Sequence, residues 1–181
     1  MLKVKLTRTT CDAYGLYDDR VVPFGGTPYI TINADICLDD EKIGYMILHE
    51  LNSDINLYDM MYQVPGDIGV IADQICDLNG NIKKSFNIQN KLVILDTLYI
   101  EPEYRNRGYG ALAAKHLLVY LNNAYEHTID AVVLYASMYE IEDCEEMDIE
   151  TFNTQSERLV RFYERAGYTN INLGVMIKKK G

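Results

Sequence analysis

Alternating apolar and polar positions mark the N-terminal part of the chain as a set of strands. Residues 2–6 alternate apolar with polar side chains, which predicts a half-buried strand rather than a signal peptide. Two longer alternating runs, 29–38 and 43–51, are separated by a short charged segment and predict an antiparallel hairpin. Residues 11–28 carry Gly and Pro without a helical period, so they are expected to form a loop.

Residues 54–90 lie between this hairpin and the next expected strand, and they have the character of an insertion. Apolar residues at helical spacing predict a helix over 67–78, with Asp67 as its N-cap and Gly80 as its C-terminal stop. The segment 58–62, just before this helix, is aromatic and contains two methionines. It either faces a bound ligand or fills the core, and the pattern leaves both alternatives open.

Two nearly continuous apolar runs, 92–100 and 131–138, predict central strands that are covered on both faces. Between them, residues 110–121 carry small and apolar side chains on one helical face. These three segments together predict a strand-helix-strand crossover.

The C-terminal part adds one more helix and a last strand. Residues 154–157 read Thr-Gln-Ser-Glu, which is the pattern of a capping box at a helix start, and Gly167 is a suitable stop. This helix carries an apolar stripe that includes Tyr163. The final run, 173–179, predicts a strand whose lysines lie outside the sheet.

Size and charge narrow the classes of protein that this chain can be. It has 181 residues, 48% of them hydrophobic, and a net charge of -10 at pH 7. A chain of this length buries about 70% of its unfolded surface as one domain, so no disulfide or metal is needed for stability. Its apolar runs are far shorter than a membrane span, and its negative charge repels nucleic-acid phosphates. We therefore expect a single cytoplasmic domain over 1–181 that binds neither membrane nor nucleic acid.

The densest negative charge lies at 140–150, where most residues are Asp or Glu. Such a run is most often a solvated loop that keeps a protein soluble. The alternative is that it lines the mouth of an amine-binding cleft, because a negative surface attracts cationic partners.

Metal and disulfide chemistry find little support in the sequence. The four cysteines are scattered without a C-x-x-C pair, so reduced thiols are expected. The three histidines lack metal-ligand spacing, and His49 is interpreted as a strand-end residue. Residues 77–81 faintly resemble a calcium loop, but they lack its bidentate Glu and fit a helix-terminating turn better. The sequence therefore predicts no metal.

The junction between the run 92–100 and the following helix predicts an anion site. A helix N-terminus presents unpaired backbone N–H groups and the positive end of the helix dipole. Gly108 and Gly110 let the backbone turn and approach a bulky polyphosphate, and Arg105 and Arg107 add two permanent cations. We therefore expect a pyrophosphate group at this helix start.

Two of the known glycine-loop chemistries fit this junction poorly. A P-loop requires Lys and Ser or Thr after its last glycine, where this chain has Ala111 and Leu112. A dinucleotide-binding turn is a closer match, but Asp130 precedes the next apolar run, whereas the ribose-binding acid belongs at the far end of that strand. Residues 101–106 also make a longer bridge than the tight first turn of such a unit.

The third known glycine-loop chemistry, acyl-CoA binding, fits this junction and a second motif further along the chain. The sequence R-x-x-G-x-G at 105–110, preceded by L-Y-I-E-P-E-Y at 98–104, resembles the acyl-CoA-binding motif of the GNAT superfamily of N-acetyltransferases. Residues 156–168, S-E-R-L-V-R-F-Y-E-R-A-G-Y, resemble the second signature of that family. The resemblance covers 92–181. It implies an α/β (α+β) fold with a mixed, mostly antiparallel sheet, splayed between its fourth and fifth strands at a bulge and flanked by helices.

The resemblance also implies a set of residues that bind acetyl-CoA, the expected co-substrate. In the family, pantetheine lies along the splayed fourth strand, and the pyrophosphate lies at the helix start. By resemblance, the pantetheine residues are Leu98, Tyr99 and Ile100, and the pyrophosphate residues are Arg105, Asn106, Arg107, Gly108, Tyr109, Gly110 and Ala111. Ser156 falls where many relatives have an Asn that contacts pantetheine; because a serine is shorter, Asn153 is the alternative partner.

Two residues take catalytic roles by the same resemblance. Tyr163 matches the tyrosine proposed to protonate the leaving thiolate, and the alternative is a purely structural core tyrosine. Asp96 matches the position of an acidic residue that removes the amine proton through water. A structural hydrogen bond to a neighbouring loop would equally explain an Asp inside an apolar run.

The function implied is transfer of an acetyl group from acetyl-CoA to a primary amine of a small molecule or protein, by direct attack in a ternary complex. The alternatives are a non-catalytic acyl-CoA-binding or regulatory module and, less well matched, a nicotinamide or flavin dinucleotide protein. The loop over 11–28 departs from the family, which usually has one or two helices there as a wall of the acceptor site. The helix over 67–78 is expected to replace this wall. The assembly is a monomer or a homodimer.

Overall fold

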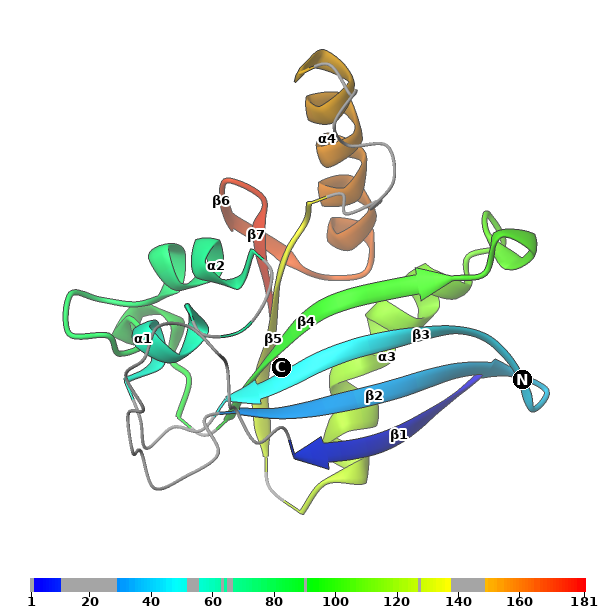
Figure 1. Ribbon diagram of the computed structural model, residues 1–181, viewed down its shortest axis with the longest axis horizontal. Coiled ribbons are helices and arrows are strands. Elements are labelled where there is room, and N and C mark those ends of the chain that lie inside the picture. The colour runs from blue at the N-terminus through cyan, green and yellow to red at the C-terminus, as the bar shows by residue number, and fades with distance from the viewer. Residues whose placement is uncertain are drawn as a thin grey trace, which may run out of the picture.

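The described part of the molecule is built around one mixed β-sheet. The computed structural model describes residues 2–10, 29–51, 56–62, 64, 67–89, 91–126, 128–137 and 149–181. Within these ranges, seven strands follow the order β1-β2-β3-β4-β5-β7-β6 (Figure 1). The strands are β1 (Leu2–Thr10), β2 (Tyr29–Leu38), β3 (Glu41–Leu51), β4 (Lys91–Ile100), β5 (Ile129–Tyr135), β6 (Thr169–Asn172) and β7 (Val175–Lys179).

Helices cover both faces of this sheet. They are α1 (Leu57–Met61), α2 (Ile68–Ile75), α3 (Tyr109–Ala124) and α4 (Ile149–Arg165), with short 3-10 turns η1 (Lys84–Phe86) and η2 (Pro102–Tyr104). Neighbouring strands are antiparallel except for β4 and β5, which run parallel. The architecture is GNAT-like, as the resemblance implied.

The N-terminal strands form as the alternation predicted. In β2, Ile32, Ala34 and Ile36 are fully buried, whereas the polar side chains between them are at least partly exposed. The turn to β3 is made by Asp39 and Asp40, both with positive φ, a conformation that Asp tolerates better than most residues. The predicted hairpin is thus confirmed, and β1 pairs along its outer edge.

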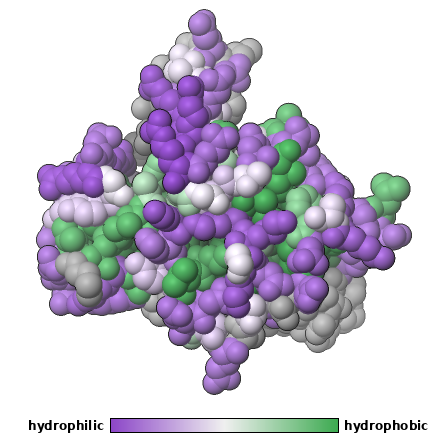
Figure 2. Space-filling model, turned by 180° about the vertical axis from the view of Figure 1, so that it is seen from behind, coloured by the Kyte–Doolittle hydropathy of each residue, from purple (hydrophilic) through white to green (hydrophobic). Residues whose placement is uncertain are grey.

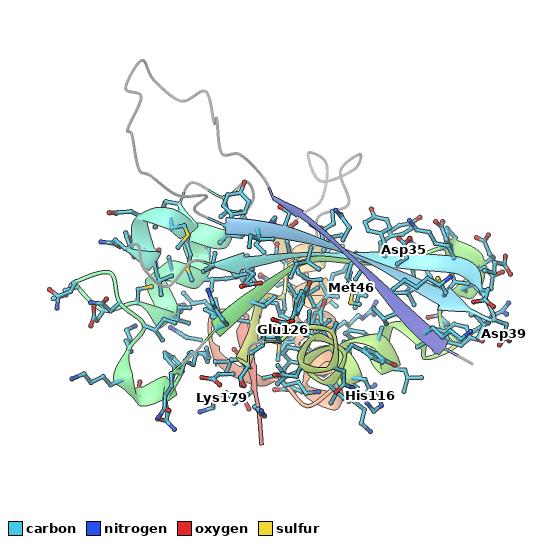
Figure 3. The ribbon with its side chains drawn as sticks, turned by 90° about the horizontal axis from the view of Figure 1, so that it is seen from below. Asp35, Asp39, Met46, His116, Glu126 and Lys179 are labelled. Atoms are coloured by element: carbon cyan, nitrogen blue, oxygen red, sulfur yellow. The ribbon has the colours of Figure 1, made fainter. Side chains whose placement is uncertain are left out.

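Two apolar clusters lie on the two sides of the sheet. On the side of α3 and α4, the stripe predicted over 110–121 is confirmed, because Ala114, Leu117 and Leu121 are buried against the strands. Figure 3 shows Met46 between the sheet and α3, and its side chain is fully buried. The other cluster lies under α1 and α2. Met60 and Met61 are fully buried there and fill the core, whereas Tyr62, expected to fill it with them, is 54% exposed.

The helix predicted over 67–78 ends earlier than the sequence suggested. Its last residue is Ile75, and Leu78 is fully exposed rather than part of the buried stripe. The Asp77 carboxylate accepts the backbone N–H groups of Asn79 and Asn81, at 2.9 and 3.1 Å. This local turn competes with the next helical turn and stops it. Asp67 is the N-cap residue as predicted, although its side chain makes no capping hydrogen bond.

The last helix begins earlier than the sequence suggested. α4 starts at Ile149, so the expected capping box at 154–157 lies inside the helix. No Pro or Gly precedes Thr154 within the helix to break it, and Glu150 in the first turn interacts favourably with the helix dipole. α4 projects beyond the sheet (Figure 1), and from behind its projecting part is mostly hydrophilic (Figure 2). Its predicted end is confirmed, with Gly167 at φ +89°.

The C-terminus is a hairpin rather than one strand over 173–179. Leu173 and Gly174, both with positive φ, form the turn between β6 and β7. The prediction that the lysines lie outside the sheet is wrong for Lys178. Its Nζ donates to the carbonyl oxygens of Ala166, at 2.7 Å, and of Lys115, and burial lowers the pKa of this amine. Lys178 therefore joins α3 to the end of α4.

Several expectations concern residues outside the described ranges. These include the loop over 11–28, most of the acidic run 140–150, and Met138 at the end of the expected strand 131–138. The described part of that strand ends at Tyr135. Both the single domain over 1–181 and the character of 54–90 as an insertion stay predictions. None of the helices in the described ranges is long and apolar enough to span a bilayer.

Candidate functional site

β4 and β5 are paired over only part of their length. The parallel ladder joins residues 91–94 of β4 to residues 129–133 of β5. Residues 97–100 of β4 continue the ladder with β3, while the end of β5 pairs with β7. In Figure 1 the two strands diverge beyond their paired ends. The splay that the resemblance implied is therefore confirmed.

A β-bulge lies where the two strands begin to part. Ile47 of β3 is opposite Thr97, and the next residue, Leu48, is opposite Leu95, so Asp96 is the extra residue. A bulge bends the strand that contains it and increases its twist. Asp96 thus occupies the position at which β4 turns away from β5.

The chain after β4 forms a turn that leads directly into α3. The last main-chain bond to β3 is donated by Glu101 N–H to Ile43 O at 2.9 Å, and η2 follows. Asn106 and Gly108 have positive φ, and Gly108 is the N-cap residue of α3. A Cβ built on Gly108 would meet no atom within 4 Å, so there is open space beside this helix start.

The predicted phosphate-binding residues surround this helix start. Arg105 donates from Nε to Ile100 O at 2.8 Å, and its guanidinium lies 5.2 Å from the centre of the Tyr99 ring. The Arg107 guanidinium lies 5.6 Å from the centre of the Tyr104 ring. Both arginines are largely exposed to solvent. The structure therefore brings two cations and the first N–H groups of α3 into one region, as a pyrophosphate site requires.

Tyr163 lies in the apolar cluster between α4 and the sheet. It is 9% exposed, and its ring makes edge contacts with Phe162 and Tyr168 at centroid distances of 4.9 and 5.5 Å. Burial raises the pKa of its hydroxyl, so the group is protonated at neutral pH and can donate a proton. The packing agrees with the structural interpretation of Tyr163, and its catalytic role stays a prediction.

Ser156 supplies a polar atom that needs a partner. Its Oγ is buried, and no hydrogen-bond partner for it is found in the described part of the chain. A buried hydroxyl without a partner costs about 1–3 kcal/mol. Such an orphaned atom on α4 fits a ligand with amide groups, as pantetheine has. The alternative partner, Asn153, is exposed on the preceding helical turn.

Within the described ranges, the contacts of Asp96 are with residues of the sheet. Its Oδ2 accepts a hydrogen bond from the Thr97 hydroxyl at 3.1 Å and lies 4.0 Å from Nε2 of His49 on β3. The Asp96 side chain is 30% exposed. It is thus accessible from outside while it faces a buried imidazole.

His49 is the residue of this region that the sequence analysis missed. Its position near the end of β3 is confirmed, but the side chain is only 7% exposed. Nδ1 lies 3.3 Å from the Thr31 hydroxyl, and the ring makes an edge contact with Tyr29. Burial lowers the pKa of His49, and the nearby Asp96 carboxylate partly opposes this shift. The alternation of apolar residues along 43–51 could have indicated a buried His49, but its partner across the strands depends on the bulge.

The predicted catalytic side chains lie on different sides of the sheet. His49 is directly opposite Ile94, which belongs to the cluster under α1 and α2, and Asp96 approaches it there. Tyr163 belongs to the cluster on the side of α3 and α4. The two predicted catalytic side chains therefore do not share one face of the sheet.

Comparisons by sequence give no relative of this chain. No protein-family model matches, and no curated protein matches either.

Comparisons by structure give distant similarities. The KacTA–DNA complex is 14% identical, with 99% of this chain and 93% of that chain covered and a TM-score of 0.46. AtaT complexed with acetyl-methionyl-tRNAfMet is 14% identical, with 82% and 71% covered and a TM-score of 0.44. Arabidopsis thaliana NAA60 with a bisubstrate analogue is 13% identical, with 82% and 75% covered and a TM-score of 0.42.

Similarities at these identities and TM-scores say nothing about activity. The fold assignment rests on this chain's own strand order, its single parallel pair and its bulge. Within the described ranges, no three His, Cys, Asp or Glu side chains gather in a way that could hold a metal ion. The predictions about metal, nucleic acid and cytoplasmic location stay predictions.

Proposed function

We propose that this protein is an N-acetyltransferase that transfers an acetyl group from acetyl-CoA to a primary amine. The observation that carries the proposal is the separation of β4 from β5 beyond Ile94, at a strand that leads directly into the glycine turn before α3. An extended acyl-thioester chain can pair with strand backbone in such a gap, while its pyrophosphate is bound at the helix start.

Three features support acetyl-CoA as the co-substrate. A Cβ built on Gly108 would meet no atom within 4 Å, which would leave room for a phosphate group beside the first N–H groups of α3, and the positive φ of this residue suits a glycine. Arg105 and Arg107 add charge that polyphosphates attract. The orphaned Ser156 hydroxyl would gain a partner in pantetheine.

The same geometry supports direct attack by the amine. Tyr163 would donate its proton to the departing thiolate from the side of α3 and α4, because its hydroxyl remains protonated at neutral pH. The amine would enter from the side of Asp96 and His49. The net charge of -10 favours a cationic acceptor, either a small molecule or a protein amine.

The direct test is a panel of acceptors with acetyl-CoA and a readout of thiol release. The panel contains small polyamines, peptides with free N-termini or lysines, and an aminoacyl-tRNA that tests the prediction against nucleic acids. We expect thiol release with at least one amine. CoA binding without turnover on any acceptor would instead favour a non-catalytic acyl-CoA-binding module, and stabilisation by NADH alone would overturn the proposal.

A matched pair of tyrosine variants tests the role of Tyr163. Tyr163→Phe should reduce kcat by about 10²-fold, the lower end for loss of a general acid, with little change in CoA affinity. Tyr168→Phe is the control, since Tyr168 is also buried and its hydroxyl donates to Ala114 O at 3.4 Å. Equal effects of the two variants on kcat would leave Tyr163 as a packing residue only.

A further inference from the structure

Three side chains from three neighbouring strands form a polar row across the sheet. The Thr31 hydroxyl on β2 lies 3.3 Å from Nδ1 of His49 on β3, and Nε2 of His49 lies 4.0 Å from Oδ2 of Asp96 on β4. The strand register explains this order, because His49 is directly opposite both Thr31 and Ile94. The bulge then brings Asp96 within reach of the same imidazole.

Burial of His49 is unusual within the described part of the molecule. The buried polar or charged residues there are His49 and Glu50. Glu50 lies 3.7 Å from the Lys91 ammonium, which compensates its charge. His49 faces Asp96 across a distance too long for a direct hydrogen bond. Its burial beside a partly exposed carboxylate calls for a reason other than packing.

We infer that His49 is the proton acceptor of the proposed reaction and that Asp96 positions the amine against it and stabilises the imidazolium. This inference rests on the proposed acetyltransferase function and adds a residue to it. It also changes the role of Asp96, which the family resemblance alone would make the base.

The 4.0 Å separation fits a single donor shared by both side chains. Two hydrogen bonds of about 2.9 Å that meet at one atom, close to a right angle, span about 4 Å. One ammonium nitrogen, or one water, can therefore donate to Asp96 Oδ2 and His49 Nε2 at the same time. The partial exposure of Asp96 gives this donor a route from solvent, while the burial of His49 keeps the imidazole fixed.

The protons of this step would pass through His49, Tyr163 and solvent. In the tautomer whose Nδ1–H donates to the Thr31 hydroxyl, Nε2 of His49 keeps a lone pair and takes one proton from the R–NH₃⁺ group. The neutral amine forms the N–C bond, the C–S bond breaks, and its electron pair stays on sulfur. Tyr163 gives its proton to that thiolate and regains one from the acylated nitrogen through solvent. His49 releases its proton to solvent, so the products are an amide, a free thiol and one proton.

The surroundings of His49 favour this role at neutral pH. Burial lowers its pKa, and of the charged groups around it the Asp96 carboxylate opposes this shift. In the described part of the chain, the other titratable side chain that contacts the ring is Tyr29 on β2. Glu50 and Lys91 project to the opposite face by the alternation of β3 and β4. A neutral imidazole at pH 7 is therefore available to accept a proton, and the nearby carboxylate stabilises the charged product.

The test is the pH dependence of kcat/KM for the best amine found, in wild type and three variants. In wild type, the rate should fall as the pH decreases through the pKa of His49, below its ordinary value of 6.5. Asp96→Asn should move this acid limb to lower pH, because the carboxylate raises the pKa of His49. His49→Gln should remove the limb and lower kcat by about 10²-fold. His116→Gln is the matched control, on the side of α3 turned away from the sheet (Figure 3), and should change neither.

A second measurement covers the case in which His49→Gln does not fold. The ring pKa of His49 in wild type, followed by NMR, should coincide with the acid limb of kcat/KM. A limb that persists in a folded His49→Gln, or that does not coincide with the ring titration, would overturn the role of His49 while leaving the acetyltransferase function intact. Absence of turnover by wild type on every amine would overturn both.

Discussion

The two halves of β4 differ in pairing and in burial. Residues 91–94 pair with β5, residues 93–94 pair with β3 as well, and Leu92, Val93 and Ile94 are buried. Beyond the bulge, residues 97–100 pair with β3 and are only half-buried. The first half is part of the sheet interior, whereas the second half is paired on one side only, and the proposed function would use it to bind acetyl-CoA.

Under the proposed function, this one strand would serve both stability and ligand binding. A single extra residue, Asp96, bends the strand at the point where its partner on one side is lost. The apolar residues before it belong to both core clusters, and after it the Tyr99 ring lies against Arg105 of the glycine turn. We therefore expect changes in the first half to act on folding and changes in the second half to act on ligands.

The largest expected effect is on stability in the first half of β4. Ile94→Ala should lower the free energy of unfolding by about 2–5 kcal/mol, because Ile94 is fully buried and the cavity cannot collapse. Leu98→Ala, in the half-buried second half, should cost less than about 2 kcal/mol. Urea unfolding of both variants measures this contrast. Equal losses would mean that the two halves pack alike.

The next effect separates backbone strain from ligand binding. Gly108→Ala should lower stability by roughly 1–2 kcal/mol, because its φ of +82° is unfavourable for a side chain. It should also weaken CoA binding by about tenfold or more, since the new Cβ occupies the space expected for phosphate.

Gly174→Ala in the β6–β7 turn is the matched control for this variant, with φ of +80°. It should lose similar stability and keep its CoA affinity, as calorimetry would show. Unchanged CoA binding by Gly108→Ala would contradict the assignment of the helix start.

A smaller effect is expected for the exposed cation beside the same turn. Arg107→Ala should weaken CoA binding by up to about fivefold, because an exposed ion pair contributes roughly 1 kcal/mol or less. The loss should shrink as salt increases. Arg161→Ala, which removes an exposed ion pair with Glu157 on α4, is the control and should leave CoA binding unchanged. Identical salt dependence of CoA affinity in wild type and Arg107→Ala would argue against a phosphate contact.

The smallest effect is the pH dependence of stability that His49 contributes. Its folded pKa lies below the unfolded value of 6.5, so the unfolded state binds more protons between the two values. The stability that the lowered pKa of His49 contributes is fully present above the unfolded pKa, and it is lost as the pH falls through the folded pKa. His49→Gln should flatten the decrease in unfolding free energy on acidification, measured by urea titrations over about pH 5 to 8. The account would be contradicted if the slope of unfolding free energy against pH stayed unchanged in His49→Gln and was lost in His116→Gln instead.

The sequence predicted most elements because their patterns are local. Alternation identified β2 and β3, continuous apolar runs identified β4 and β5, and the small-residue stripe identified α3. The errors arose where two local signals competed. The capping box at 154–157 was a plausible start but lies inside α4, and the Asp77 turn ended α2 before Leu78.

The candidate site was predictable only in part, for a related reason. Gly108 and its arginines form a contiguous motif, so the sequence alone indicated an anion site there. The approach of His49 to Asp96 joins two strands distant in sequence, and a bulge sets its register. A shift of one residue would turn Asp96 to the opposite face, so no local pattern could predict this pair.

The most direct test of the central claim is amide hydrogen exchange of the protein with and without CoA, resolved by residue. We predict that CoA slows exchange at 98–100 and 107–111 and leaves 91–94 unchanged, because the ligand would bind where β4 has left β5 and where α3 begins. Unchanged exchange in both of these segments at saturating CoA would contradict the account.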